Sequence, residues 1–283
     1  MPFDRALIQG FLRGRGITSS RILPSGKTNT SYKLVLSDGQ ACVLRLYSRG
    51  DAAREVAIMD LVRDLVPVPR EIDRGDGWSV FSFMEGELLQ RVPEHSGAAA
   101  RALVRISSVE FDSPGWINRD GSVSPFSFGG GDGYAAEMQD RDDVRAWLGE
   151  EAVQAVRDIT DREADRLEEL SADSRLVHGD FNPTNVLVRD GAVSGILDWE
   201  FSHSGTRYMD IGNLLRNTNP SIHHLIGAGL ESEGMSLPDD WQERAELVDL
   251  SSHLEFLTST RSDSFKLQCV ARVHVFIRRF LDT

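Results

Sequence analysis

The stretch Leu176–Phe201 reads LVHGDFNPTNVLVRDGAVSGILDWEF, and the expected fold is organised around it. Two short apolar runs within it, Val186–Val188 and Ile196–Leu197, lie on either side of the dipeptide Asp190-Gly191. Aspartate followed by glycine between β-branched residues favours a hairpin whose turn has positive φ angles. The stretch therefore predicts a hairpin with polar residues near both of its ends.

Four polar side chains surround this hairpin: His178, Asp180, Asn185 and Asp198. Asp180 precedes Asn185 by five positions, and Asp198 follows Asn185 by thirteen. A carboxylate and an amide oxygen on neighbouring loops can share Mg²⁺, which prefers oxygen ligands. A further carboxylate can hold a hydroxyl that attacks a phosphoryl group. Each residue alone is more often a turn, cap or core residue, but their joint spacing predicts a catalytic site.

This spacing matches the protein-kinase signature H-R-D-L-x-x-x-N followed by D-F-G. Here the sequence is H-G-D-F-N-P-T-N and then D-W-E, so that Gly179 replaces the arginine and Trp199-Glu200 replaces Phe-Gly. With these departures the chain resembles the aminoglycoside phosphotransferase family, which includes the choline-kinase-like small-molecule kinases. The resemblance is specific in this central stretch and weaker over the rest of the chain, from about Gly26 to the end.

The resemblance implies an α+β, bilobal, protein-kinase-like fold. A small antiparallel β lobe with five strands and a helix would span residues 1–85 and bind the nucleotide. A larger, mostly helical lobe over residues 86–283 would carry the catalytic and substrate sites. The order of strands first and helices afterwards also favours this architecture over a doubly wound sheet.

The resemblance also assigns roles to the polar residues of the central stretch. Asp180 would be the catalytic base that orients the acceptor hydroxyl, and Asn185 and Asp198 would bind Mg²⁺. His178 would brace the catalytic loop. Asp210, in a helix that follows the stretch, would also support this loop and would not take part directly in the chemistry.

The first lobe supplies candidates for contacts with the nucleotide phosphates. Ser25-Gly26-Lys27-Thr28 is not a Walker A motif, because Arg21 lies where the first glycine is required. The resemblance implies instead that a short polar loop covers the phosphates. Its candidate residues are Gly26, Thr28, Asn29 and Ser31, with an ordinary surface hairpin as the alternative.

Arg45 lies where protein kinases have a strand lysine that a glutamate of the next helix orients. The resemblance places Arg45 on the α- and β-phosphates and makes Glu55 the residue that orients it. The alternative for Glu55 is a solvated helix charge. Met84 and Glu85 are the implied hinge residues, whose backbone would hydrogen-bond the nucleotide base.

Two further segments carry expectations about structure. Phe111–Gly133 is predicted to be a long loop, which we interpret as a substrate-side flap because long loops are usually functional. Its run Gly129–Gly133 does not fit a nucleotide-binding pattern. Two helices rich in charged residues are expected at about Tyr134–Leu148 and Glu151–Leu170.

Composition excludes some classes of partner. A net charge of −13 at pH 7 argues against nucleic acid and is compatible with a cationic substrate. Cys42 and Cys269 lie in apolar segments without C-x-x-C spacing, so they are predicted to be buried free thiols in a reducing compartment. No apolar run approaches the roughly 18 residues of a membrane span, and no signal-peptide pattern is visible. We therefore expect a cytoplasmic protein without a membrane partner; its oligomeric state stays open.

The predicted activity is transfer of the γ-phosphate of ATP, or GTP, to a hydroxyl of a small molecule, with Mg²⁺ as cofactor. A pseudokinase that binds nucleotide without turnover is the main alternative, and the intact Asp180, Asn185 and Asp198 count against it. A protein kinase is disfavoured because D-F-G and A-P-E are missing, and a structural module would not need these polar groups. Aminoglycosides, macrolides, choline-like amines, amino-alcohols and sugars all fit as acceptors.

Overall fold

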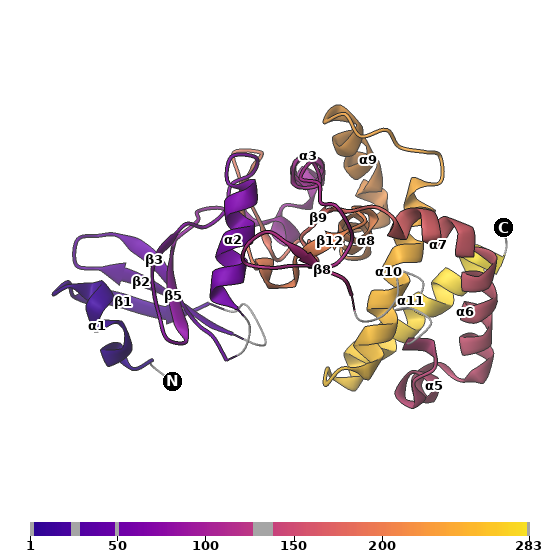
Figure 1. The fold of residues 1–283 in the computed structure, drawn as a ribbon, viewed down its shortest axis with the longest axis horizontal. Coiled ribbons are helices and arrows are strands. Elements are labelled where there is room, and N and C mark those ends of the chain that lie inside the picture. Colours follow the sequence, from indigo (N-terminus) through magenta and orange to yellow (C-terminus); the bar gives the residue numbers. More distant parts are fainter. Residues whose placement is uncertain (1–2, 24–28, 49–50, 127–137, 282–283) are drawn as a thin grey trace.

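The computed structural model of the protein describes residues 3–23, 29–48, 51–126 and 138–281. An antiparallel β lobe comes first along the chain and a larger helical lobe follows, with helix α2 (Ala52–Val62) between them (Figure 1). The predicted α+β, kinase-like architecture is therefore confirmed. Among the helices described, none is both long enough and apolar enough to cross a membrane.

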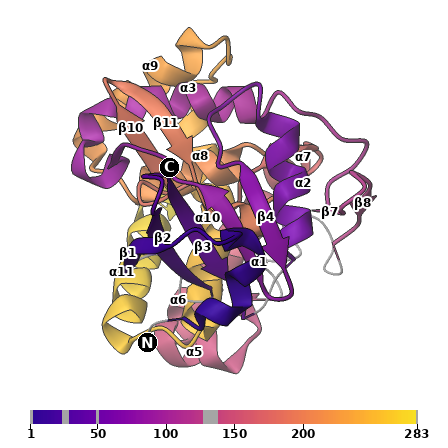
Figure 2. The same ribbon diagram turned by 90° about the vertical axis from the view of Figure 1, so that its left-hand side faces the viewer.

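The β lobe contains a five-stranded sheet in the spatial order β1-β2-β3-β5-β4, with every pair antiparallel. Its strands are β1 (Ile17–Ile22), β2 (Thr30–Leu36), β3 (Ala41–Leu46), β4 (Glu71–Gly75) and β5 (Trp78–Ser82). Alternation along β2 separates the two faces, because successive side chains of a strand point in opposite directions. Tyr32 and Leu34 are buried beneath η1 (Arg5–Ile8) and α1 (Gln9–Leu12), which cover one face (Figure 2).

The opposite face of the sheet packs against α2 and carries Arg45. Asp51 caps this helix by accepting hydrogen bonds from the backbone N–H groups of Ala53 and Arg54, which satisfies donors that the first turn otherwise leaves unpaired. The capped turn carries Arg54 and Glu55. Apolar residues farther along the helix, such as Ile58 and Met59, are buried in a core that continues into the helical lobe.

The helical lobe combines long helices with short strands. Its helices are α3 (Ser96–Ile106), α5 (Asp142–Leu148), α6 (Glu150–Arg162), α7 (Ala164–Ser171), α8 (Tyr208–Arg216), α9 (His223–Ser232), α10 (Trp241–Thr258) and α11 (Asp263–Leu281). Short 3₁₀ helices are η2 (Leu89–Arg91), η3 (Pro93–His95), η4 (Trp199–Phe201) and η5 (Pro220–Ile222). Its strands are β6 (Glu87–Leu88), β7 (Trp116–Ile117), β8 (Val123–Ser124), β9 (Arg175–Val177), β10 (Val186–Arg189), β11 (Ala192–Ile196) and β12 (His203–Gly205).

Two of the expectations about this lobe were wrong. The helix predicted over Glu151–Leu170 is divided into α6 and α7, which are interrupted at Glu163. Ile159 of α6 and Leu167 of α7 pack in one hydrophobic core, and Leu170 of α7 reaches a second core. The loop predicted over Phe111–Gly133 contains the small hairpin β7–β8. The glycine run Gly129–Gly133 lies outside the described residues. Cys42 and Cys269 are buried free thiols, as predicted.

Candidate active site

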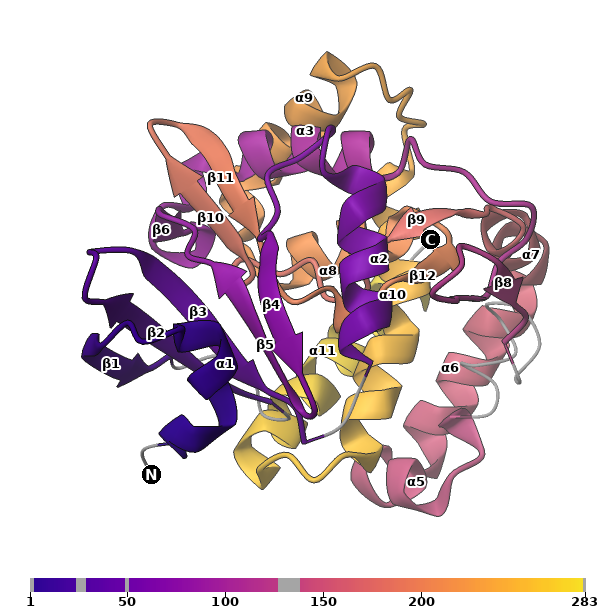
Figure 3. The same ribbon diagram turned by 60° about the vertical axis from the view of Figure 1, so that its left-hand side comes forward.

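The central hairpin is confirmed and lies against the segment that joins the two lobes. Strands β10 and β11 pair antiparallel, and the turn residues Asp190 and Gly191 have φ angles of 52° and 76°. Strand β6 pairs with β10 on the other side (Figure 3). The Ser194 hydroxyl donates a hydrogen bond of 2.7 Å to the carbonyl of Glu85. The hairpin thus fixes the predicted hinge residue Glu85 relative to the loop that precedes β10.

His178 is fully buried in that loop and joins its two ends. Its Nδ1 accepts a hydrogen bond of 3.2 Å from the backbone N–H of Asp180. The other ring nitrogen, Nε2, therefore carries the proton and donates to the carbonyl of Leu197 at 3.0 Å. Burial lowers the pKa of His178, which favours this neutral form. The contacts connect the loop at Asp180 to the residue before Asp198, which is the bracing geometry that was predicted.

Asp210 supports the same loop from helix α8. Its two carboxyl oxygens accept hydrogen bonds from the backbone N–H groups of His178 at 2.7 Å and Gly179 at 2.9 Å. Burial raises the pKa of Asp210 to about 7, although these two hydrogen bonds act in the opposite direction. Asp210 therefore fixes the loop through its backbone, as expected.

Gly179 explains why this chain has H-G-D where protein kinases have H-R-D. Its φ is +82°, a left-handed conformation that favours glycine. A Cβ atom at this position would lie 2.4 Å from the carbonyl oxygen of Phe201. A residue with a side chain would meet both a strained backbone and a clash with the segment after Asp198.

Asp180 and Asn185 are in direct contact. The amide nitrogen of Asn185 donates to the Asp180 carboxylate and to the Asp180 carbonyl, each at 2.9 Å. Asn182, which the sequence reasoning missed, donates to the second carboxylate oxygen of Asp180 at 2.7 Å. The backbone N–H of Leu197 donates to the Asn185 carbonyl at 2.8 Å. These bonds fix the Asp180 carboxylate and connect Asn185 to the strand that leads to Asp198.

Arg45 lies at the centre of a cluster of carboxylates. Its Nη1 contacts Glu55 at 2.9 Å, and its Nη2 contacts Asp198 at 2.7 Å and Glu200 at 3.1 Å. Burial lowers the pKa of Arg45, but Glu55 and Asp198 outweigh that effect and raise it. Burial raises the pKa of Glu55, and the cation of Arg45 opposes this. The predicted contact of Arg45 with Glu55 is present, and Glu55, only 4% exposed, is no solvated helix charge.

The chemistry of this cluster fits a nucleotide phosphate with Mg²⁺. Arg45 Nε is buried and has no hydrogen-bond partner among the described residues, so an additional acceptor such as a phosphate oxygen could satisfy it. Three carboxylates share one guanidinium, and this excess of negative charge favours a divalent cation. Asp198 has a φ of 67°, a strained conformation that is common at functional sites.

Asp198 and the Asn185 amide would be the protein ligands of that cation. Nowhere in the described part of the chain do three or more His, Cys, Asp or Glu side chains form a metal-binding group. Mg²⁺ commonly uses one or two carboxylates together with substrate phosphates and water, so a site of one carboxylate and one amide is compatible with it.

The other residues that were predicted to contact the nucleotide lie in different surroundings. Asn29 is buried, donates to Glu200 at 2.9 Å and accepts from the backbone N–H of Ser48 at 3.1 Å. Ser31 pairs with Arg45 across strands β2 and β3. Gly26 and Thr28 lie outside the described residues. The hinge candidates Met84 and Glu85 directly follow Ser82 and Phe83, and Glu85 pairs with Arg189 at 2.7 Å.

Sequence reasoning missed two further members of the Arg45 cluster. The Tyr47 hydroxyl donates to the second oxygen of Glu55 at 3.0 Å, and burial raises the pKa of Tyr47. Glu200 receives hydrogen bonds from Arg45 and Asn29. Glu200 could have been found from its place in the D-W-E motif. Tyr47 carried no signal beyond its position just after strand β3.

A model described as the phosphotransferase enzyme family matches residues 19–247. No curated protein sequence matches this chain significantly.

Many solved structures share the fold, including the following three. A macrolide 2′-phosphotransferase from Brachybacterium faecium has 14% identity and a TM-score of 0.64, with 96% of this chain and 98% of that chain covered. A thermostable mutant of aminoglycoside phosphotransferase APH(4)-Ia, in a ternary complex with AMP-PNP and hygromycin B, has 16% identity and a TM-score of 0.67, with 97% of each chain covered. A protein proposed to be a fructosamine-3-kinase, from Thermobifida fusca, has 18% identity and a TM-score of 0.70, with 98% and 100% covered.

Proposed function

This chain belongs to the phosphotransferase enzyme family, and from that premise we propose that it transfers the γ-phosphate of ATP, or GTP, to a hydroxyl group of a small molecule. The contact of Asp180 with Asn185 and that of Arg45 with Asp198 together carry this proposal. They bring a candidate base, two candidate metal ligands and a phosphate-binding cation into one connected network. AMP-PNP in the complex of a similar structure also supports a nucleotide donor.

The two lobes would have different functions. We assign nucleotide binding to residues 1–85 and the catalytic and acceptor sites to residues 86–283. In the first lobe Arg45 would hold the donor phosphates and Glu55 would orient Arg45. The loop residues Gly26, Thr28, Asn29 and Ser31 would cover the phosphates, and the backbone at Met84 and Glu85 would bind the base.

Asp180 would act on the acceptor. Its carboxylate would accept a hydrogen bond from the acceptor hydroxyl and orient it in line with the γ-phosphorus. As the hydroxyl oxygen forms its bond to phosphorus, the bond to the β–γ bridging oxygen breaks and ADP leaves. The hydroxyl proton passes to Asp180. The hydrogen bonds from Asn182 and Asn185 hold the carboxylate for this task while each oxygen retains a free lone pair.

Mg²⁺, held by Asn185 and Asp198, would neutralise charge on the phosphate oxygens. Most of phosphoryl-transfer catalysis comes from positioning and electrostatics. The rigid support of the loop by His178 and Asp210 suits that requirement.

The test is an ADP-release screen with Mg·ATP and Mg·GTP across aminoglycosides, macrolides, amino-alcohols, choline-like amines and sugars. We expect nucleotide-dependent thermal stabilisation and turnover with at least one acceptor class. Asp180→Asn should abolish turnover but retain nucleotide binding. Asp190→Asn, an exposed turn residue, is the matched control. Binding without turnover on any acceptor would favour a pseudokinase instead.

A further inference from the structure

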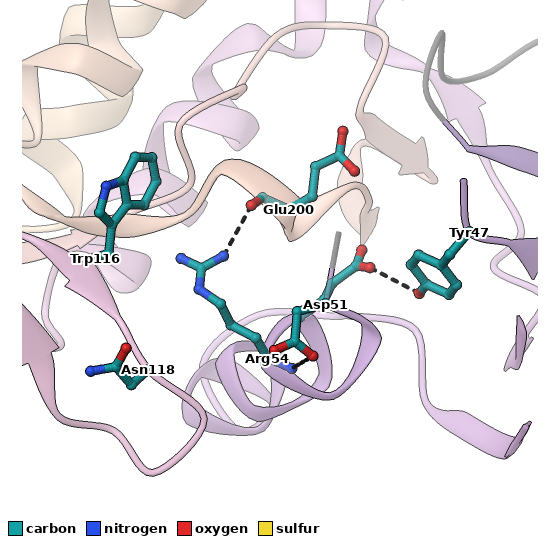
Figure 4. Close-up of a pocket in the computed structure, with 7 residues that line it drawn as sticks. Tyr47, Asp51, Arg54, Trp116, Asn118 and Glu200 are labelled. Carbon is teal, nitrogen blue, oxygen red and sulfur yellow. Dashed lines mark hydrogen bonds between the residues drawn. The ribbon is translucent and has the colours of Figure 1, made fainter. Parts of the chain in front are cut away.

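Arg54 links helix α2 to two distant segments through backbone carbonyl groups. Its Nε donates to the carbonyl of Ile117 at 2.6 Å and its Nη1 to that of Glu200 at 3.0 Å. Its Nη2 donates to the carbonyl of Ser202. Figure 4 shows the guanidinium reaching from α2 toward the Glu200 segment. The three hydrogen bonds hold the guanidinium group in one fixed orientation.

These contacts require a guanidinium rather than only a positive charge. The three acceptors are neutral carbonyls at separate points, and arginine presents planar, divergent donors that lysine lacks. The guanidinium also lies 5.7 Å from the ring centroid of Trp116, a distance at which a cation–π contact adds further attraction. Lysine would preserve the positive charge but could not make most of these hydrogen bonds to the three carbonyl groups.

The carbonyl partners lie next to the residues of the proposed mechanism. Glu200 and Ser202 follow Asp198 by two and four positions. The Ser202 hydroxyl donates to the carbonyl of His178 at 3.1 Å, which continues the connection into the catalytic loop. On the other side, Arg54 immediately precedes Glu55, the partner of Arg45.

We propose that Arg54 is a positioning residue that holds α2 against the segment after Asp198. It thereby sets the distance between Glu55 and Asp198, which Arg45 bridges. This inference rests on the proposed function. Arg45 itself connects Glu55 of α2 to Asp198, but phosphate oxygens would compete for its guanidinium. The Arg54 contacts do not involve Arg45, so donor phosphates that bind Arg45 would not compete for them.

A cavity of about 390 Å³ gives solvent access to the Arg54 side chain. Arg54, Trp116, Asn118 and Asp51 are among the residues that line it (Figure 4). Shortening Arg54 to alanine would enlarge this cavity at the place where its guanidinium lies. A small planar cation from solution could then occupy that place.

The experiment compares Arg54→Ala and Arg54→Lys with Arg63→Ala, a control at the C-cap of the same helix, where the arginine pairs with the exposed Asp60. For both Arg54 variants we expect kcat to fall roughly 100-fold, the size of effect that a displacement of about 1 Å produces. The KM for ATP should change much less than kcat, because the base stays anchored at the hinge and Glu55 keeps its contact with Arg45, while lost transition-state contacts lower kcat selectively. Arg63→Ala should match wild type.

Chemical rescue separates positioning from general stabilisation. Millimolar guanidinium should raise the kcat of Arg54→Ala roughly tenfold or more, as expected for restored hydrogen bonds to a charged group, whereas methylammonium should not. Guanidinium weakens folded proteins, so rescue cannot result from increased stability. Circular dichroism at the assay temperature confirms that each variant is folded.

Three outcomes would overturn the proposal: normal kcat in Arg54→Ala, full activity in Arg54→Lys, or loss of kcat that guanidinium does not restore in a folded Arg54→Ala variant. Failure of wild type to bind Mg·ATP or to release ADP on any acceptor is a separate result. It refutes the proposed function, and the role of Arg54 is refuted with it.

Discussion

Arg45 and Asp198 form an ion pair, with Nη2 and Oδ1 2.7 Å apart, although 153 positions separate them in the sequence. The residue proposed to hold donor phosphates thus contacts the residue proposed to hold the metal. The two opposite charges stabilise each other, which lowers the free-energy cost of keeping both partly buried. Binding of a metal nucleotide would exchange this pair for contacts with phosphate and cation.

Asp198→Ala should abolish Mg²⁺-dependent turnover, because the substitution removes a metal carboxylate and the partner of Arg45. ADP release measured over a range of Mg²⁺ concentrations checks this, with Asp239→Ala, at an exposed position, as the surface control. Retained Mg²⁺-dependent activity would defeat the assignment of Asp198.

Glu55→Gln should raise the KM for ATP roughly tenfold, the typical effect of weakening one charge-assisted hydrogen bond. The neutral amide keeps the shape of the side chain but no longer balances the charge of Arg45. Initial-rate kinetics with varied ATP provide the measurement. Glu255→Gln, at an exposed position of α10, is the matched control. An unchanged KM would show that Glu55 does not orient Arg45 for the nucleotide.

Gly179→Ala should destabilise the protein and reduce kcat. Both Gly179 and Gly121 have a φ of +82°, but an added Cβ meets the Phe201 carbonyl only at Gly179, while Gly121 has open space around it. A left-handed non-glycine residue costs about 1–3 kcal/mol, and Gly121→Ala should show that backbone effect alone. Urea unfolding of both variants isolates the clash. Equal losses of stability in the Gly179→Ala and Gly121→Ala variants would mean that the segment at Phe201 moves aside at no cost in free energy.

Asp210→Asn should change how stability depends on pH. The pKa of Asp210 is near its ordinary value of 3.8 in the unfolded chain and about 7 in the folded chain. Between about pH 4 and pH 7 the unfolded state has lost this proton while the folded state retains it. The Asp210 contribution to the free energy of unfolding therefore falls as the pH rises through this window.

Asparagine does not titrate, so the difference in unfolding free energy between wild type and Asp210→Asn should shrink from pH 4 to pH 7. Urea titrations at several pH values measure it. A constant offset is also expected, since the amide can accept only one of the bonds from His178 and Gly179, and an unpaired buried N–H costs about 1–3 kcal/mol. A difference independent of pH would show that Asp210 ionises normally.

Local patterns in the sequence predicted those parts of the structure that depend on neighbouring residues. Asp190-Gly191 predicted the turn, because positive φ angles at both positions suit those residues. The contact of Arg45 with Glu55 followed from the kinase pattern. By contrast, Arg54 meets the Glu200 carbonyl across 146 positions, and a backbone carbonyl has no sequence signature. Glu151–Leu170 has continuous helical periodicity, and no local pattern in the sequence marks the break at Glu163 between α6 and α7.

Helix α2 belongs to the first lobe in sequence, yet its apolar side packs in the same core as Phe181, Trp199 and Ile211. A fragment that ended near residue 85 would expose the buried side chains of Ile58 and Met59 to water. Such a fragment should therefore aggregate when expressed alone, and the first lobe should not be separable from the remainder of the chain as a folded protein.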